Sequence, residues 1–331
     1  MMGRRAVLAA AAVAPMPARA EGFSTTDIRF RGAGGVTLAG TLVMPERSKQ
    51  QKVPGAVLIA GSGPTDRDGN NPLIPLKIDI LKQIAELLAG AGIASLRYDK
   101  RGIGRSTKAP GTLAEAERFW GWENFIGDVQ LAHAELCRQK EVKDYATALF
   151  GHSEGGLFAI ATAELSIAQE PYALVLAGTP GRTIQEIIRQ QLGRSMPALV
   201  TSAERIMDTI RRTGHVPADV PREIAPYFPP DIGLFLSREL GFDPAAALAR
   251  LKQPCLLLHG GADGQVVPLG DIQPLLDALN KRNVPSEAFV VPEVSHNLKP
   301  VAGPTDPGFA GPVAPAIAAK LTSWLASTLG A

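Results

Sequence analysis

Six short apolar segments, separated by helical patterns, constrain the fold of this chain more than any other feature of its sequence. They are rich in Ala, Val, Leu and Ile, as strands are when a parallel sheet buries them on both faces. The six segments are 56–59, 94–98, 146–150, 174–176, 256–258 and 288–291. Between them, residues 80–90 and 125–137 place apolar side chains at helical spacing. Strands that alternate with helices predict a doubly wound, mostly parallel α/β sheet with right-handed crossovers.

Two segments depart from this alternation. Residues 23–44 alternate apolar and polar side chains around the glycine-rich turn 32–35, which predicts an N-terminal hairpin. Residues 182–250 carry helical patterns interrupted by prolines, and they precede the penultimate predicted strand. We expect them to form a helical cap, or lid, over the carboxyl edge of the sheet; an elaborated crossover without a lid role is the alternative. The remainder of 21–331 is expected to be one α/β domain.

The first 20 residues have the pattern of a secretory signal peptide. Two arginines precede the apolar run 6–13, which is too short to span a bilayer, and Ala-Arg-Ala at 18–20 resembles a cleavage site. We therefore expect an exported protein, periplasmic or secreted, cleaved near Ala20. An irregular N-terminus without a targeting role is the alternative, and the pattern leaves the Sec and twin-arginine routes open.

Composition narrows the function classes. The chain is 45% hydrophobic and 20% charged, which is typical of a globular protein with a sizeable core. Loss of residues 1–20 removes three arginines and no acid, so the formal charge changes from +2 to −1. No basic cluster indicates nucleic-acid binding, and nothing after residue 20 predicts a membrane span. Cys137 and Cys255 fall in different predicted layers, so we expect two separate buried thiols. The sequence indicates no oligomeric state.

A Gly-x-Ser-x-Gly motif at 151–155 joins the strand 146–150 to a predicted helix that begins at Gly156. Such glycines permit a sharp turn that exposes the serine in a strained backbone conformation. A serine hydroxyl becomes an effective nucleophile when it is exposed, rigidly held and next to a base. We therefore predict that Ser153 is the nucleophile of a serine hydrolase.

The base and the acid of such a site should follow the serine in the order acid, then histidine. Of the five histidines, only His296 follows the last predicted strand in a polar loop, so it is the predicted base. We expect His133 at the surface or in a groove and His259 in the core. Asp263 follows the preceding strand and is the predicted acid, whereas its rival Asp271 is expected to cap the next helix.

The tetrahedral intermediate of acyl transfer also needs two backbone donors. The N–H of Glu154 is one candidate, because it follows the nucleophile at a helix N-terminus. The loop after the first buried strand supplies the other, with Ser62 the first choice and Gly63 the next. His152 lies within the turn, and we expect its ring to line the site while pointing away from the hydroxyl of Ser153.

Two longer motifs now carry a resemblance to a known family. Gly61–Asn70 reads GSGPTDRDGN, and Tyr98–Ser106 contains Asp-x-Arg-Gly-x-Gly-x-Ser. From about residue 23 onward the chain resembles the α/β-hydrolase superfamily, and it looks most like the bacterial carboxylesterase branch that carries the first motif. The resemblance implies hydrolysis of small-molecule, short-chain carboxylic esters through an acyl-enzyme, without a metal or an organic cofactor. The residues it implies for the site are Ser153, Asp263, His296, Ser62 and Glu154.

Some interpretations stay open at this stage. Asp66, Arg67 and Asp68 either line the site or pair with one another to hold their loop, and we favour the structural role. A serine peptidase or aminopeptidase of the prolyl-peptidase type is the alternative enzyme, because such peptidases share this domain. A non-catalytic binding protein on a hydrolase fold is the alternative of another class, because a fold does not guarantee an activity.

Overall fold

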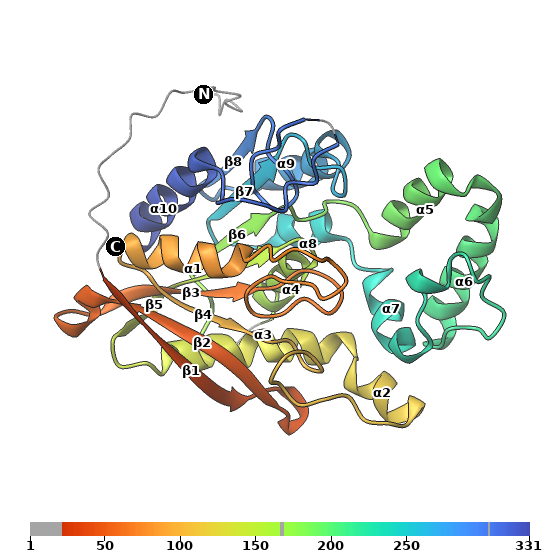
Figure 1. Cartoon of the computed structure of the whole chain (residues 1–331), viewed down its shortest axis with the longest axis horizontal. Helices are drawn as coiled ribbons and strands as arrows, with labels where there is room; N and C mark the ends of the chain where they lie inside the picture. Colours follow the sequence, from red (N-terminus) through yellow and green to blue (C-terminus); the bar gives the residue numbers. More distant parts are fainter. Residues whose placement is uncertain (1–21, 166–168, 304) are drawn as a thin grey trace.

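Eight strands form one sheet in the order β1-β2-β4-β3-β5-β6-β7-β8 in the computed structural model, which describes residues 22–165, 169–303 and 305–331 (Figure 1). The strands are β1 Phe23–Arg31, β2 Thr37–Pro45, β3 Val53–Ile59, β4 Ala94–Tyr98, β5 Val142–His152, β6 Ala173–Ala177, β7 Cys255–Gly260 and β8 Ser286–Val291. β1 and β2 form the predicted hairpin, β2 pairs antiparallel with β4, and all other pairs are parallel. The predicted fold class is confirmed. The predicted signal peptide lies outside the described residues.

The central strands are apolar throughout because both of their faces are covered. Successive side chains of a strand point to opposite faces of the sheet. Val57 and Ile59 of β3 therefore enter one apolar cluster, whereas Ala56 and Leu58 enter the other. All four side chains are fully buried.

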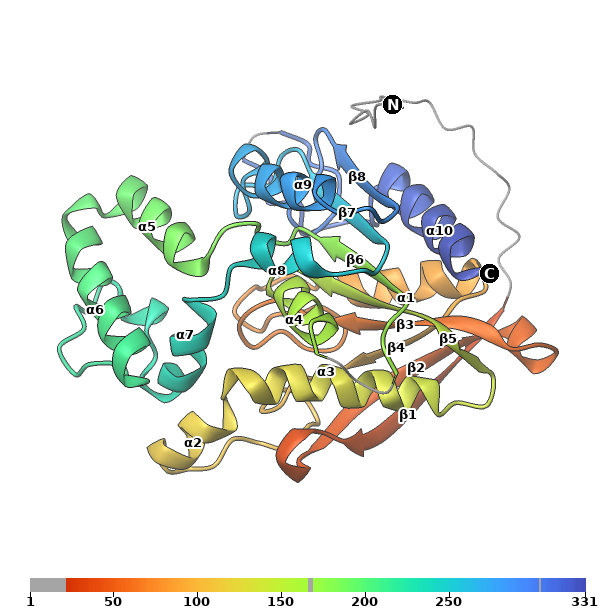
Figure 2. The same ribbon diagram turned by 180° about the vertical axis from the view of Figure 1, so that it is seen from behind.

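Helices lie between and after the strands, and several of them cover the two faces of the sheet. They are α1 Ile80–Gly90, α2 Leu113–Phe119, α3 Trp122–Cys137, α4 Glu154–Ala163, α5 Ile184–Ser195, α6 Val200–Thr213, α7 Gly233–Glu239, α8 Pro244–Arg250, α9 Gln273–Asn280 and α10 Pro315–Leu329. α1 and α10 pack on the face seen in Figure 1, and α3, α4, α8 and α9 pack on the face seen in Figure 2. Among the helices of the described chain, none is long and apolar enough to cross a membrane.

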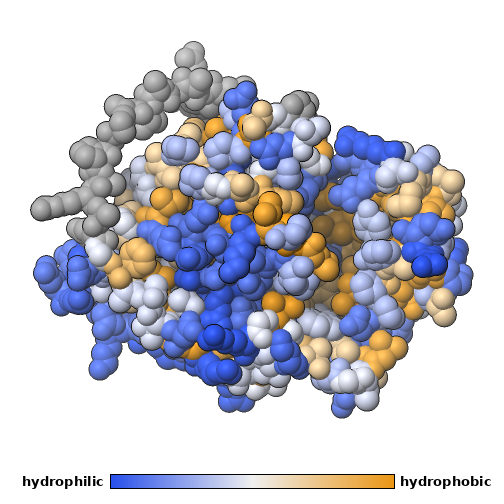
Figure 3. All heavy atoms as spheres, viewed as in Figure 1, coloured by the Kyte–Doolittle hydropathy of each residue, from blue (hydrophilic) through white to orange (hydrophobic). Residues whose placement is uncertain are grey.

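The segment between β6 and β7, where the cap is expected, contains α5, α6, α7 and α8. α5, α6 and α7 extend beyond the carboxyl ends of the strands, to the right in Figure 1. α8 differs from them, because it packs against α4 and α9 on the sheet face. The range 182–250 therefore ends in a helix that belongs to the sheet-covering layer. Figure 3 shows an apolar recess between the sheet-bearing body and the part formed by α5 to α7.

The strand order identifies the edge where a site is expected. β4 and β5 lie on opposite sides of β3, so the connections after β3 and after β4 run in opposite directions across the sheet. Ligands of open α/β sheets bind outside the carboxyl ends of the strands at such a switch point. The GSGPTDRDGN loop follows β3 and Ser153 follows β5, so both lie at this edge.

Candidate active site

Ser153 joins β5 to α4 with φ 56° and ψ −126°, a backbone conformation that residues other than glycine rarely adopt. Its N–H donates to the carbonyl oxygen of Ala177 at 2.8 Å. The flanking chain comes so close that a Cβ on Gly151 would lie 2.4 Å from the carbonyl oxygen of Gly155. A Cβ on Gly155 would lie 2.4 Å from the carbonyl oxygen of Ile59. Both motif glycines are therefore required, and their packing holds Ser153 in a strained conformation.

His296 and Asp263 meet at the same edge, after β8 and β7. The Nδ1 of His296 lies 2.7 Å from Oδ2 of Asp263, and both side chains are buried. The other carboxylate oxygen of Asp263 accepts the N–H groups of Gln265 and Val266 at 2.8 and 2.9 Å. Burial raises the pKa of Asp263, but the hydrogen bond and charge of His296 and the Val266 N–H outweigh it, so the pKa is lowered. Asp263 is thus held ionised, as an acceptor for a proton on Nδ1.

His296 is tied to the turn that carries Ser153 through two neighbours. Gly178 follows Ala177, the acceptor for Ser153, and a Cβ on Gly178 would lie 3.2 Å from Nδ1 of His296. Nε2 of His152 lies 2.9 Å from the carbonyl oxygen of His296, and the two rings are 4.9 Å apart. Burial lowers the pKa of His152 to about 4, so its ring is neutral near pH 7 and donates this hydrogen bond. His152 therefore positions the backbone of His296.

Three expectations for other residues need correction or refinement. His133 is buried rather than at the surface, and its Nε2 lies 2.7 Å from the hydroxyl of Thr147. Asp271 does not cap α9: it lies inside the short helical segment Pro268–Ile272 before that helix, and its carboxylate pairs with Arg182 at 2.9 Å. His259 lies in the core as expected, but its Nδ1 has no hydrogen bond and lies 3.9 Å from Oδ2 of Asp263. Sequence position alone does not reveal these partners.

The two cysteines are free thiols, as predicted. Cys255 is fully buried in β7, whereas Cys137 is only half-buried at the end of α3. The expectation that both are buried is therefore correct for Cys255 alone.

The loop after β3 lies directly against the serine. A Cβ on Gly61 would lie 3.1 Å from the Cβ of Ser153. Within the described residues, the N–H groups of Ser62 and Glu154 have no protein acceptor. Glu154 begins α4, where N–H groups have no intrahelical partner and attract negative charge. Gly63 has φ +66°, and a Cβ on it would lie 3.5 Å from Nδ2 of Asn71.

The acidic and basic residues of the GSGPTDRDGN loop form hydrogen bonds and ion pairs that hold the loop. The carboxylate of Asp66 accepts the N–H groups of Asp68 and Asn70, both at 2.9 Å. Arg67 pairs with Asp99 at 2.8 Å, after β4, rather than with its neighbours.

Asp68 pairs with Arg97 of β4 at 2.8 Å. The loop is therefore fastened to the adjacent strand, which fixes its position above the edge of the sheet.

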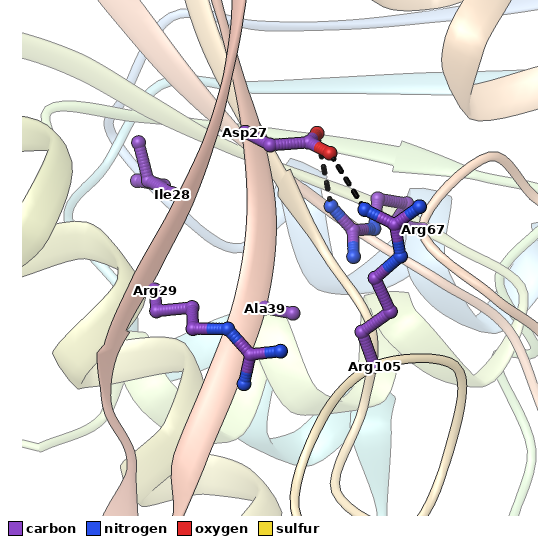
Figure 4. A pocket seen from close by; sticks show the side chains of 6 residues that line it. All are labelled: Asp27, Ile28, Arg29, Ala39, Arg67 and Arg105. Atoms are coloured by element: carbon purple, nitrogen blue, oxygen red, sulfur yellow. Dashed lines mark hydrogen bonds and ion pairs between the residues drawn. The ribbon is translucent and has the colours of Figure 1, made fainter.

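The same network reaches a pocket on the hairpin side of the molecule. Figure 4 shows Arg67 and Arg105 converging on Asp27 of β1, at 3.3 and 3.0 Å. This pocket has a volume of about 330 Å³, and Ser153 is not among its lining residues. Arg67 therefore lines a separate surface pocket.

Sequence reasoning missed a buried cluster beside the turn. Lys100 lies within the Tyr98–Ser106 motif, where it occupies a variable position. Its Nζ donates to the carbonyl oxygen of Gly61 at 2.5 Å and lies 3.8 Å from Oε2 of Glu154. The side chain of Glu239 on α7 interacts with the carboxyl group of Glu154. The sequence signal was a lysine two residues after a buried strand. Within the described residues, no group of three or more His, Cys, Asp or Glu side chains could hold a metal.

Comparison with known proteins places this geometry in context. The model of a family described as serine aminopeptidase, S33, matches residues 77–299. Esterase EstD of Thermotoga maritima is 31% identical over 252 residues, which are 74% of this chain and 53% of that protein. The chain thus spans about half the length of this curated relative.

Solved structures agree in fold and differ in activity. The Pyrococcus furiosus esterase superposes with a TM-score of 0.58 at 16% identity, over 99% of this chain and 98% of the other. A puromycin-hydrolyzing peptidase of Mycobacterium tuberculosis gives 0.59 at 17% identity, over 96% of this chain and 41% of the other. Both similarities establish the α/β-hydrolase fold, and neither selects a substrate.

Proposed function

Because the chain belongs to the serine aminopeptidase, S33, family, we propose that it is a serine hydrolase that cleaves carboxylic esters of short-chain acids. The observation that supports this most strongly is the pairing of His296 with Asp263 at the same edge of the sheet as a serine held at positive φ. A serine in such a turn is exposed and rigid, and it needs only a base to attack a carbonyl carbon.

The proposed reaction is acyl transfer in two steps. His296 takes the hydroxyl proton of Ser153 as Oγ attacks the ester carbonyl, and it then protonates the departing alcohol. Water attacks the resulting acyl-enzyme with the same base, which releases the acid and restores the serine. Asp263 keeps the proton on Nδ1 of His296, so that Nε2 is free to accept, and stabilises the imidazolium that forms.

The developing negative charge needs donors that are already in place. The N–H groups of Ser62 and Glu154 have no protein acceptor among the described residues, and their two chain segments flank Ser153. In this proposal they donate to the oxyanion. Loss of one such donor typically costs about 100- to 1000-fold in kcat.

Ester hydrolysis is proposed ahead of peptide hydrolysis because the curated relative EstD is named an esterase. The family description favours a second candidate, a serine aminopeptidase. The two differ in the leaving group, since the same nucleophile and base act on an ester or an amide carbonyl.

One experiment separates these candidates. Purified protein is assayed against p-nitrophenyl esters of increasing acyl length and against aminoacyl and prolyl p-nitroanilides, with Ser153→Ala as the matched control. We expect kcat/KM to be highest for the short esters and to fall by at least about 1000-fold in the variant. Faster cleavage of the anilides would select the aminopeptidase. Ester hydrolysis that survives in Ser153→Ala would contradict both.

We also propose that the protein is exported and cleaved near Ala20. The support is the sequence pattern of residues 1–20, with its arginines, short apolar run and small residues before the cleavage position.

A further inference from the structure

Lys100 lies just beyond the carboxyl end of β4, next to the residues that follow the parallel strand β3. β3 and β4 are paired with Leu58 opposite Arg97, so the residues three positions further along, Gly61 and Lys100, meet at the carboxyl edge. The side chain of Lys100 is buried, and its Nζ donates to the carbonyl oxygen of Gly61 at 2.5 Å. A buried ammonium group needs such partners, because burial without them is costly.

The acceptor belongs to the peptide group that carries the proposed oxyanion donor. The carbonyl oxygen of Gly61 and the N–H of Ser62 are the two ends of one planar peptide, and in a trans peptide they point in opposite directions. A hydrogen bond from Lys100 to the oxygen therefore fixes where the N–H points. A charged donor also polarises the peptide, which strengthens the N–H as a donor on the other side.

We propose that Lys100 is a positioning residue of the oxyanion hole, one that orients and polarises the Gly61–Ser62 peptide toward the tetrahedral intermediate. This inference rests on the proposed function. Lys100 does not touch the substrate in this account, since it acts through the peptide of Gly61.

Two carboxyl groups hold the ammonium in place. Glu154, the residue after the serine, brings Oε2 to 3.8 Å from Nζ of Lys100. Glu239 of α7 is buried, and its charge acts on Glu154 and Lys100. Burial raises the pKa of both carboxyl groups, that of Glu239 well above its usual value. The cluster therefore connects helix α7 of the cap to both donors of the hole.

The test is Lys100→Met, which keeps an unbranched side chain as far as the ε atom and removes the Nζ donor. Lys299 provides the matched control, because it is also a buried lysine whose Nζ donates to carbonyl oxygens, those of Ile78 and Phe309. Each variant is measured for kcat and KM on the best ester and for inhibition by an alkyl boronic acid. The boronate forms a tetrahedral adduct on the serine, and its oxygen occupies the oxyanion hole.

For Lys100→Met we expect kcat to fall by about 10- to 100-fold, with KM nearly unchanged and boronate affinity falling in parallel, because the lost interaction is made mainly in the transition state. Lys299→Met should keep the wild-type boronate affinity. A folded Lys100→Met with wild-type kcat and boronate affinity would overturn the proposal. So would a rise in KM alone, or an equal loss of boronate affinity in Lys299→Met.

A second variant covers the case in which Lys100→Met does not fold. Glu154→Gln keeps the backbone N–H and the size of the side chain but removes the carboxylate nearest to Lys100. We expect a several-fold loss of kcat with a parallel loss of boronate affinity, and no change in either would refute the proposal. Wild-type protein and Ser153→Ala are assayed together with these variants. If Ser153→Ala keeps the ester activity, the proposed function fails, and that result is distinct from any result at Lys100.

Discussion

Replacement of His133 by Gln is expected to make the protein more resistant to mild acid. His133 lies on α3 with 1% of its surface exposed, and burial lowers its pKa from the usual 6.5 to about 4. Above pH 6.5 the ring is neutral in both the folded and the unfolded chain. As the pH falls below that value, the unfolded chain takes up a proton that the folded chain does not, so the free energy of unfolding decreases.

The size of this effect follows from the two pKa values of His133. One pKa unit corresponds to about 1.36 kcal/mol. The difference between 6.5 and about 4 therefore lowers the free energy of unfolding by about 3 kcal/mol when the pH has fallen to about 4. Urea denaturation followed by circular dichroism, from about pH 7 down to about pH 4, measures it. Between these limits the wild-type protein should lose about 3 kcal/mol more than His133→Gln. The pKa of His152 is also lowered to about 4, so the free energy of unfolding of His133→Gln should still decrease in part as the pH falls. Parallel losses in the two proteins would refute the assignment of a neutral, buried His133.

Three further predictions concern the site and its processing. Asp263→Asn should lower kcat by about 1000- to 10000-fold with KM nearly unchanged, because the amide favours the wrong tautomer of His296. A loss of kcat of less than tenfold in steady-state kinetics would contradict this. Ser153→Gly should have a free energy of unfolding in urea about 1 kcal/mol higher than that of Ser153→Ala, because glycine tolerates φ 56° and alanine does not. An equally stable alanine variant would contradict a strained backbone at this position. Expression in a Gram-negative host should give a periplasmic protein whose N-terminus, read by mass spectrometry, follows Ala20, and a chain retaining Met1 would exclude the cleavage.

Much of the fold was predictable because the sheet is buried on both faces. A strand such as β3 must be apolar at every position, so the segments that form the sheet stand out from the helices between them. The position of Ser153 was also predictable, because the close approach of α4 at Gly151 and of the end of β3 at Gly155 admits only glycine, and those glycines appear in the sequence. Both features depend on the residue types within a short segment, so the sequence of that segment is enough to predict them.

The partners of buried polar groups were not predictable, because they depend on which loops meet in three dimensions. His133 contacts Thr147 of β5, and although its spacing from Val129 and Leu136 places it on the buried side of α3, nothing near it in sequence indicates this partner. Asp271 meets Arg182, which is 89 residues away. Lys100 meets Gly61 only because β4 lies beside β3, and that neighbourhood follows from strand order rather than from any motif.

The central claim, that Ser153 is the nucleophile, is tested most directly by covalent labelling. Wild-type protein is treated with a fluorophosphonate, and the adduct is located by intact-mass and peptide mass spectrometry. The account predicts one phosphonyl group per chain, on the peptide that contains Ser153, together with loss of ester hydrolysis in proportion to labelling. Labelling of a different residue, or full ester hydrolysis by protein labelled at Ser153, would contradict it.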